Sequence, residues 1–369
     1  MNKLALYCRA GFEKEVAAEM NEKATALGIF GFARVVEQSG YVIFECYQAG
    51  EADRLAREIP FHQWIFVRQL VVVSNLLHDL TPEDRISPIV QQYRALAHQI
   101  NLNLIDELLV ETADTNEDKA LLTFCRKFTV PLRQALKKQG WLNVSTGKKC
   151  GLTLHIFFIN ATNCYVGYSY NRNHSAHFMG IPRLKFPTDA PSRSTLKLEE
   201  AILTFIPKEE ERTRLNDTMY AVDLGACPGG WTYQLVKRGL FVYAVDHGKM
   251  ADSLHETGRI EHCSEDGFKF QPPKKQKIDW LVCDMVEQPS RIAALISKWF
   301  INGWCRESIF NLKLPMKKRY VEVQQCLQRI EDDLLQQGLH CVIRAKHLYH
   351  DREEVTVYIR LKNKDNLVV

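Results

Sequence analysis

The stretch with the most evident chemistry is a glycine-rich turn in residues 221–239, AVDLGACPGGWTYQLVKRG, which follows an apolar run ending in an acid. A helical pattern begins at Trp231, so the sequence predicts a strand, a turn and a helix, an arrangement that holds nucleotides at the start of the helix. No Lys-Ser or Lys-Thr follows the glycines, so no lysine is available to grip a γ-phosphate. Cys227 replaces the middle glycine that a pyrophosphate needs for close approach to the backbone. The turn therefore favours a nucleoside without a phosphate.

Three acids lie at the ends of apolar runs in the same region. Asp246 comes about 20 residues after the turn, where a carboxylate can accept hydrogen bonds from ribose hydroxyls. Asp266 could face an adenine amino group, and Asp284 ends the run DWLVCD. Any one of them could simply cap a helix or satisfy a turn. Ligands of open α/β sheets bind outside the carboxyl ends of the strands, where all three acids would gather.

S-adenosylmethionine has a ribose and an adenine but no phosphate, and it fits this arrangement. It is therefore the predicted cofactor. The predicted cofactor-binding residues are Ser194, Asp223, Gly225, Cys227, Pro228, Gly229, Gly230, Trp231, Asp246, Asp266 and Asp284.

The glycine-rich turn resembles the first motif of the FtsJ-type ribose 2′-O-methyltransferases. The resemblance runs nearly end to end and is closest to the members that modify large-subunit ribosomal RNA. It implies an N-terminal half that contains a THUMP domain, and 2′-O-methylation of a cytidine in 23S ribosomal RNA. The expected substrate is RNA before the subunit is fully assembled. The segments that carry it are FGFARV, ADTNEDK, FCRKFTVPLR, MGIPRLKFPTDAPSRSTLKLEEA, VCDMVE, NLKLPMKKRY and YHDREEVTV.

The resemblance also implies a catalytic set of Lys197, Asp284, Lys313 and Glu354. Lys313 would take the 2′-proton while the methyl group passes in line from sulfonium to oxygen. A second ammonium at Lys197 and desolvation would disfavour the charged form of Lys313, and the two carboxylates would orient the lysines. Taken alone, Lys197 would be a solvated helix residue and Lys313 a charge at a strand end. Glu353 competes with Glu354, which we favour because the alternation in EVTVYIR places it on the face of Thr356.

The region after the fourth strand of the methyltransferase domain argues against other methyl acceptors. It reads CDMVEQP, without the Asn/Asp-Pro-Pro-aromatic sequence that amino-methylating enzymes use to clamp a base. Enzymes that methylate cytosine C5 need a nucleophilic cysteine there, but Cys283 precedes Asp284 at the strand end and is better explained as a packed thiol.

A basic stretch predicts contacts with RNA. Residues 125–150 hold seven Lys/Arg and no Asp/Glu, and several of them share one helix face. A solvated surface helix is the simpler alternative, but the absence of compensating acids favours phosphate contacts. A second basic segment with interleaved aromatics follows at 171–191. The predicted RNA-binding residues are Arg126, Lys127, Arg133, Lys137, Lys138, Arg172, Arg183 and Lys185.

The remaining composition excludes several classes of protein. The net charge of +4 is small, and no apolar run approaches the roughly 20 residues of a membrane span. The 11 cysteines are scattered without a CxxC pair, which indicates reduced thiols in the cytoplasm and not a disulfide framework. The histidine pairs His174/His177, His255/His262 and His347/His350 lack further partners at ligand spacing, so no metal is predicted.

The first 170 residues predict two α+β units. Strands and helices in the order βαββαβ indicate a ferredoxin-like unit at 1–80. Prolines in 79–88 break the pattern, and a THUMP-like unit follows at 81–170. The first unit is predicted from a strand at 3–8, a helix at 12–27, a hairpin at 33–47, a helix at 53–58 and a strand at 64–73. The second is predicted from a helix at 89–104, a strand at 107–113, a helix at 117–138 and a hairpin of strands at 152–160 and 164–170.

The basic linker at 171–191 has no regular pattern, and strands then alternate with helices to the end of the chain. This alternation predicts an α/β multidomain protein whose residues 192–369 form a Rossmann-like methyltransferase sheet ending in an antiparallel pair. Its strands are expected at 220–224, 241–245, 260–263, 278–283, 308–312, 340–346 and 354–360.

Two other functions stay open at this point. A non-catalytic RNA-binding or ribosome-assembly factor could keep the methyltransferase fold as a relic, although the intact set of four residues argues against it. An NAD-dependent oxidoreductase is disfavoured by Cys227 at the position of the middle glycine.

Overall fold

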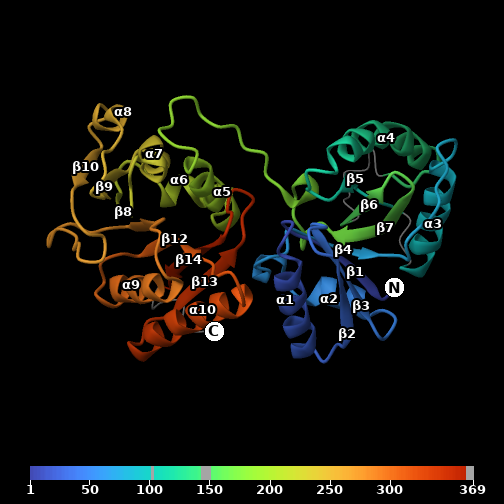
Figure 1. Ribbon diagram of the computed structural model, residues 1–369, viewed down its shortest axis with the longest axis horizontal. Coiled ribbons are helices and arrows are strands. Elements are labelled where there is room, and N and C mark those ends of the chain that lie inside the picture. The colour runs from blue at the N-terminus through green and yellow to red at the C-terminus, as the bar shows by residue number, and fades with distance from the viewer. Residues whose placement is uncertain (101–103, 143–150, 363–369) are drawn as a thin grey trace. The chain divides into compact units, whose positions relative to one another are not determined.

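The computed structural model describes residues 1–100, 104–142 and 151–362 (Figure 1). The chain divides into two compact units, Met1–Pro182 and Arg183–Val369. The segments predicted as ferredoxin-like and THUMP-like both lie in the first unit, and the predicted methyltransferase segment lies in the second.

The first part of unit 1 has the predicted ferredoxin-like arrangement. Its four strands pair antiparallel in the order β2-β3-β1-β4, and α1 and α2 pack against them. Ala5 and Tyr7 pack in one buried cluster, and Leu4 and Leu6, which alternate with them along β1, are buried on the opposite face, so the sheet has a two-sided core. The elements are β1 (Lys3–Tyr7), α1 (Glu13–Ala26), β2 (Gly31–Val35), β3 (Tyr41–Cys46), α2 (Glu51–Glu58) and β4 (Gln69–Val73).

The prediction of a strand over 64–73 is wrong for its first half, because β4 begins only at Gln69. The backbone N–H groups of Ile65 and Phe66 donate instead to the buried carboxylate of Glu19, at 2.6 and 2.9 Å. These apolar residues are thus buried in a loop whose polar groups are satisfied by a side chain, a solution that apolar patterning does not reveal.

The second part of unit 1 continues the same sheet. β7 pairs with β4, which gives one mixed sheet in the order β2-β3-β1-β4-β7-β6-β5. The predicted hairpin of β6 and β7 is confirmed. The helix predicted at 89–104 instead ends at Gln99. The elements are α3 (Ile86–Gln99), β5 (Glu107–Thr112), α4 (Lys119–Lys138), β6 (Leu152–Asn160) and β7 (Asn163–Tyr170).

Unit 2 is an open α/β sheet in the order β10-β9-β8-β11-β12-β14-β13. The terminal antiparallel pair is confirmed, and the predicted α/β fold with it. α5 and α7 cover one face, where Phe205 and Trp231 of the helices pack in one cluster with Trp280 of the sheet, while α9 and α10 pack together on the other (Figure 1). Its strands are β8 (Tyr220–Leu224), β9 (Phe241–Val245), β10 (Ile260–Cys263), β11 (Trp280–Cys283), β12 (Glu307–Lys313), β13 (Cys341–Lys346) and β14 (Glu354–Leu361). Its helices are α5 (Thr195–Phe205), α6 (Lys208–Arg214), α7 (Gly230–Lys237), α8 (Asp252–His255), α9 (Pro289–Ile301) and α10 (Arg319–Gln336).

The strand directions bring the predicted site residues to one edge of this sheet. β8, β9, β11 and β12 are parallel, so their carboxyl ends lie on the same side. β14 runs antiparallel to β12, so it is the start of β14 that lies there, and Lys313 is paired in register with Glu354. Residues distant in sequence therefore meet at this edge.

Candidate active site

Four charged side chains meet at the carboxyl edge of the unit 2 sheet. Lys313 ends β12, Glu354 begins β14, Asp284 directly follows β11, and Lys197 lies in the first turn of α5. The Lys313 Nζ lies 2.7 Å from Asp284 Oδ1 and 3.6 Å from Glu354 Oε2. The Lys197 Nζ lies 3.3 Å from Asp284 Oδ2 and 2.5 Å from Glu354 Oε1. Each lysine thus contacts both carboxylates.

The ion pairs set the charges in this cluster. Burial disfavours the charge on Asp284, but the ammonium groups of Lys313 and Lys197 outweigh it, and the pKa of Asp284 lies below its ordinary value. Burial likewise opposes the charge on Lys197, but Asp284 and Glu354 outweigh it, and the pKa of Lys197 is raised. Lys197 is therefore an ammonium at neutral pH in this state.

The structure distinguishes Glu354 from its neighbour Glu353. Glu354 is buried and faces both lysines, whereas Glu353 is exposed and pairs with Arg319 at 2.9 Å. Partial burial also separates Lys197 and Lys313 from solvated surface lysines, since their side chains are only 17% and 21% exposed.

The glycine-rich turn connects β8 to α7 beside this cluster. Gly225 and Gly229 have φ values of +78° and +115°, which residues with a side chain rarely adopt. Gly230 begins α7 so close to Ser194 that a Cβ would lie 2.0 Å from the serine Oγ. At the start of α7 the turn therefore packs against Ser194, while Cys227 and Pro228 are exposed at its tip.

Two of the predicted acids are half-buried acceptors, Asp246 directly after β9 and Asp266 in the loop after β10. Asp246 accepts hydrogen bonds from the backbone N–H groups of Cys227, at 3.1 Å, and Gly248, at 2.8 Å. It therefore ties the glycine-rich turn to the end of β9. Asp266 accepts from the N–H of Phe268 at 2.9 Å. A carboxylate has about four lone-pair sites, so both acids keep acceptor capacity for ribose or adenine groups.

Asp223 and Trp231, predicted as cofactor contacts, are buried beneath the turn instead of lining it, with exposures of 1% and 3%. Thr232 donates a 2.7 Å hydrogen bond to Asp223 Oδ2, and Oδ1 is buried without a partner. Burial raises the pKa of Asp223 to about 7. Asp223 lies on the buried strand β8 and Trp231 on α7 within the core cluster, so both side chains support the turn from the core.

Sequence reasoning missed several residues that hold the cluster. Glu200, one turn after Lys197, accepts the backbone N–H groups of Tyr349 and His350 at 2.8 and 2.9 Å. It thereby joins α5 to the segment before β14. Asn311 donates to Asp284 Oδ1 at 2.9 Å from within β12. An asparagine inside the apolar run IFNLK was the available signal, because buried polar residues require partners.

Four residues of the predicted basic stripe, Arg126, Lys127, Lys137 and Lys138, are exposed on α4, whereas Cys125 and Leu136 face the core. The fifth, Arg133, is half-buried and donates to the Leu108 carbonyl of β5 at 3.5 Å. Lys148 and Lys149 complete the basic stretch but lie outside the described residues. Arg172, Arg183 and Lys185 are also exposed.

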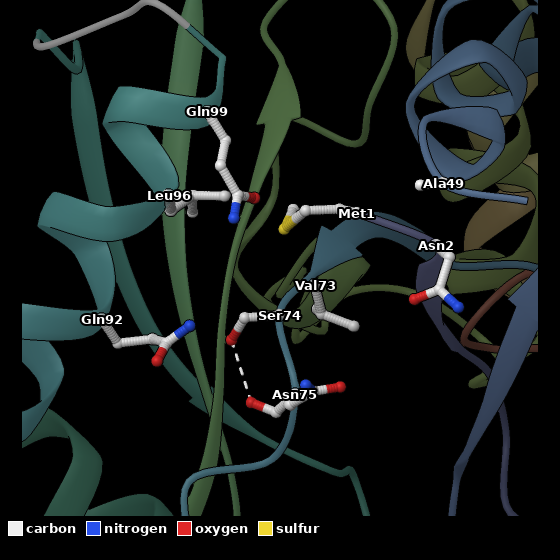
Figure 2. Close-up of a pocket in the computed structure, with 9 residues that line it drawn as sticks. All are labelled: Met1, Asn2, Ala49, Val73, Ser74, Asn75, Gln92, Leu96 and Gln99. Carbon is white, nitrogen blue, oxygen red and sulfur yellow. Dashed lines mark hydrogen bonds between the residues drawn. The ribbon is translucent and has the colours of Figure 1, made fainter.

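Metal-binding groups, disulfides and membrane-spanning helices are not found among the described residues. Within residues 1–100, 104–142 and 151–362, no group of three or more His, Cys, Asp or Glu side chains is placed to hold a metal ion. The ten described cysteines are free thiols. None of the described helices is long and apolar enough to cross a membrane. A pocket in unit 1, between the end of β4 and α3, contains none of the predicted site residues (Figure 2).

Comparison with known proteins assigns most of the chain to three family models. Residues 190–358 match the FtsJ-like methyltransferase model, residues 1–71 the RlmM ferredoxin-like domain, and residues 84–170 the N-terminal region of ribosomal RNA large subunit methyltransferase M. The chain is 76% identical to ribosomal RNA large subunit methyltransferase M of Pasteurella multocida, over 99% of this chain and 100% of that protein. It is 73% identical to the protein of the same name from Haemophilus influenzae strain Rd, over 98% of this chain and 100% of that protein.

The sheet, the glycine-rich turn and the charged edge define an FtsJ-like methyltransferase that uses S-adenosylmethionine. More narrowly, the chain belongs to the ribosomal RNA large subunit methyltransferase M family. The predicted family, enzyme class and methyl donor are confirmed.

Proposed function

We propose that this enzyme methylates the 2′-hydroxyl of a cytidine in 23S ribosomal RNA, with Lys313 as general base. The observation that carries this proposal is the pairing of Lys313 and Lys197 with the same two carboxylates, Asp284 and Glu354. A sugar hydroxyl holds its proton tightly, so its methylation needs a base and groups that orient it. This cluster supplies both in a partly enclosed setting.

The side chains divide the work of proton transfer. Lys197, bound to both carboxylates and kept charged, donates a hydrogen bond to the 2′-oxygen. Lys313 takes the 2′-proton on Nζ as the new carbon–oxygen bond forms. Asp284 holds Lys313 at 2.7 Å and stabilises the ammonium that results. Glu354 fixes the angle between the two lysines.

Lys313 must lose its own proton before it can act. The cluster has two ammonium groups and two carboxylates, and its net charge is zero. S-adenosylmethionine supplies the methyl group on a positively charged sulfonium. One further positive charge beside the cluster favours release of a proton from a lysine. Lys313 is the better candidate because its second ion pair, to Glu354, is longer than either pair of Lys197.

The residues around the glycine-rich turn fit the donor. The turn offers no lysine to a phosphate, while Asp246 and Asp266 offer carboxylate oxygens to ribose hydroxyls and to an amino group. The backbone at positions 225, 229 and 230 lies so close to packed neighbours that a Cβ there would collide with them, so glycine suits all three positions. We propose that Ser194, Cys227 and Pro228 complete this surface.

We propose that the exposed basic residues of α4 and of 171–191 bind the RNA backbone, because Lys and Arg displace counterions from phosphates. A THUMP-like role for residues 81–170 belongs to the same proposal. The acceptor hydroxyl must be reachable, so the substrate is RNA before complete assembly of the large subunit, in the bacterial cytoplasm.

The test of this proposal is Lys313→Ala, compared with Lys208→Ala, which removes an exposed lysine of α6. Transfer of tritiated methyl to unmodified 23S RNA should fall by about a thousandfold in the first variant and stay normal in the second. The wild-type product should resist alkaline cleavage at a cytidine. Calorimetry should find S-adenosylmethionine binding retained in both. Transfer at the normal rate by Lys313→Ala, or an alkali-sensitive product, would contradict the proposal.

A further inference from the structure

A line of buried polar side chains leads from the charged cluster into the core of unit 2. Asn311 Nδ2 donates to Asp284 Oδ1 at 2.9 Å. Thr356 Oγ1 lies 2.7 Å from Asn311 Oδ1, and 3.1 and 2.9 Å from the two carboxyl oxygens of Asp351. Asn311, Thr356 and Asp351 are each 0% exposed. Asn311 and Thr356 face each other as register partners in β12 and β14.

These side chains have few hydrogen atoms to share among the hydrogen bonds that join them. Asp284 is ionised, so it accepts, and the amide nitrogen of Asn311 must point toward it. The Asn311 carbonyl oxygen therefore faces Thr356, and the single hydroxyl hydrogen of Thr356 is used in a hydrogen bond to that oxygen. The contact between Thr356 and Asp351 then has two oxygen acceptors and no hydrogen, unless Asp351 carries one.

We propose that Asp351 is a protonated, neutral carboxylic acid that positions Asp284 through Thr356 and Asn311, and hence positions the two lysines. Asp351 donates to Thr356, Thr356 to Asn311, and Asn311 to Asp284. Asp351 is fully buried and out of reach of RNA and donor, so it acts as a positioning residue. The inference depends on the proposed role of the lysine–carboxylate cluster.

The surroundings of Asp351 assign the proton to one oxygen. The backbone N–H of Leu348 donates to Asp351 Oδ2 at 3.0 Å, so Oδ2 acts as an acceptor. The proton belongs on Oδ1, 3.1 Å from the Thr356 hydroxyl. Burial, with the charges of Glu354 and Glu200, raises the pKa of Asp351 well above its ordinary value. The ring of His347, on the same segment, uses Nε2 toward the Arg352 carbonyl at 3.0 Å.

An ionised Asp351 would reverse the direction of the hydrogen bonds between these side chains. It would attract the hydroxyl hydrogen of Thr356 and leave the Asn311 oxygen 2.7 Å from another oxygen. The Asn311 amide would then rotate and turn its oxygen toward the Asp284 carboxylate, which repels it. Asp284 would lose one donor and move relative to Lys313. A proton far from the reacting atoms thus controls the geometry of the cluster.

Three variants test the direction of these hydrogen bonds. Asp351→Asn places an NH2 group where the acid hydrogen lies and an oxygen where Leu348 donates, so it should keep kcat within about threefold of wild type. Asp351→Ala and Thr356→Val each interrupt the line and should lower kcat about tenfold or more, with the KM for RNA unchanged. Thr356→Ser, which keeps the hydroxyl, is the matched control and should remain active. Were Asp351 ionised, its two oxygens would accept from both Leu348 and Thr356, so the Asn variant, with a single oxygen, would lose one of these hydrogen bonds and fall with the Ala variant, which would overturn the proposal.

An infrared difference spectrum gives a readout independent of activity. Wild type minus Asp351→Asn, at neutral pH, should contain the C=O stretching band of a protonated carboxylic acid. A carboxylate band in its place would overturn the proposal even if Asp351→Ala failed to fold. Failure of the proposed function would show itself differently, as normal methyl transfer by Lys313→Ala with the acid band still present.

Discussion

Two clusters of polar side chains in this molecule are each organised around carboxylates and differ in exposure. In unit 1, Glu111 accepts hydrogen bonds from Tyr7 at 3.1 Å, His155 at 2.9 Å and the Met179 N–H at 2.6 Å. His155 Nε2 lies 2.7 Å from Ser169 Oγ. Glu111, His155 and Ser169 are each 0% exposed. In unit 2, the side chains of the lysine–carboxylate cluster are 9–21% exposed.

The difference shows that residue types alone do not define an active site. Glu111, His155 and Ser169 have the chemistry of a nucleophilic triad, but no substrate can reach a fully buried serine. The Ser169 hydroxyl is already hydrogen-bonded to both His155 and His174. Burial lowers the pKa of His174 to about 4. The unit 1 cluster therefore stabilises the fold, whereas the unit 2 cluster keeps charged groups at an accessible edge.

The largest expected effect is that of Asp284→Asn on the rate of methyl transfer. The variant removes one of two carboxylates between Lys197 and Lys313, so both lysines must share Glu354 and the proposed base, Lys313, is no longer oriented. We expect kcat to fall about a thousandfold, or about 4 kcal/mol of activation free energy, while the melting temperature changes little. Single-turnover methyl transfer and calorimetric unfolding measure the two quantities.

The control for that variant is Asp332→Asn, which makes the same chemical change at an exposed site on α10. It should leave both the rate and the melting temperature as in wild type. A large loss of stability in Asp284→Asn with little loss of rate would remove the distinction between the two clusters.

The next effect is on stability and comes from the unit 1 cluster. Glu111→Gln keeps the shape but places an NH2 group among donors, so at least one buried donor loses its acceptor. We expect the free energy of unfolding to fall by about 3 kcal/mol, measured by urea denaturation. The kcat of the folded variant should be unchanged. A variant as stable as wild type but inactive would assign a catalytic role to this cluster.

A smaller effect depends on pH and concerns Asp223. Its pKa of about 7 lies above the ordinary value near 3.9, so the folded state binds more protons between these values, and stability falls as pH rises through that range. In Asp223→Asn this fall is absent. From about pH 5.5 to about pH 8, the variant should gain about 2 kcal/mol of unfolding free energy relative to wild type. An identical pH dependence in the two proteins would show that Asp223 is ionised throughout.

Much of this fold could be predicted from the pattern of apolar and acidic residues in the sequence. The strands of unit 2 were predictable because buried parallel strands read as short apolar runs, and acids at their ends mark the ligand edge. The roles of Lys197, Lys313 and Glu354 came from family resemblance, since each alone would read as an ordinary surface charge. Their meeting depends on β14 running antiparallel beside β12, which no local pattern determines.

The rest could not be predicted because it depends on contacts between distant residues. Glu19 satisfies the backbone of Ile65 and Phe66, and it reads in sequence as one more charge on an amphipathic helix. Thr356 looks like any threonine in a strand, and its partner Asn311 lies 45 residues away. The roles of these residues follow from their burial and from their hydrogen bonds, which can be known only from the folded structure.

The smallest expected effect concerns RNA affinity at the exposed face of α4, which bears neither cluster. Arg126→Ala combined with Lys137→Ala removes two exposed cations without disturbing buried side chains. RNA binding should weaken about tenfold at low salt, while kcat at saturating RNA stays constant. The slope of log K against log salt should become shallower by about 1.5, since each lost phosphate contact contributes about 0.7 to 0.9. Lys208→Ala should leave the slope unchanged, and a double variant with an unaltered slope would show that this face does not touch RNA.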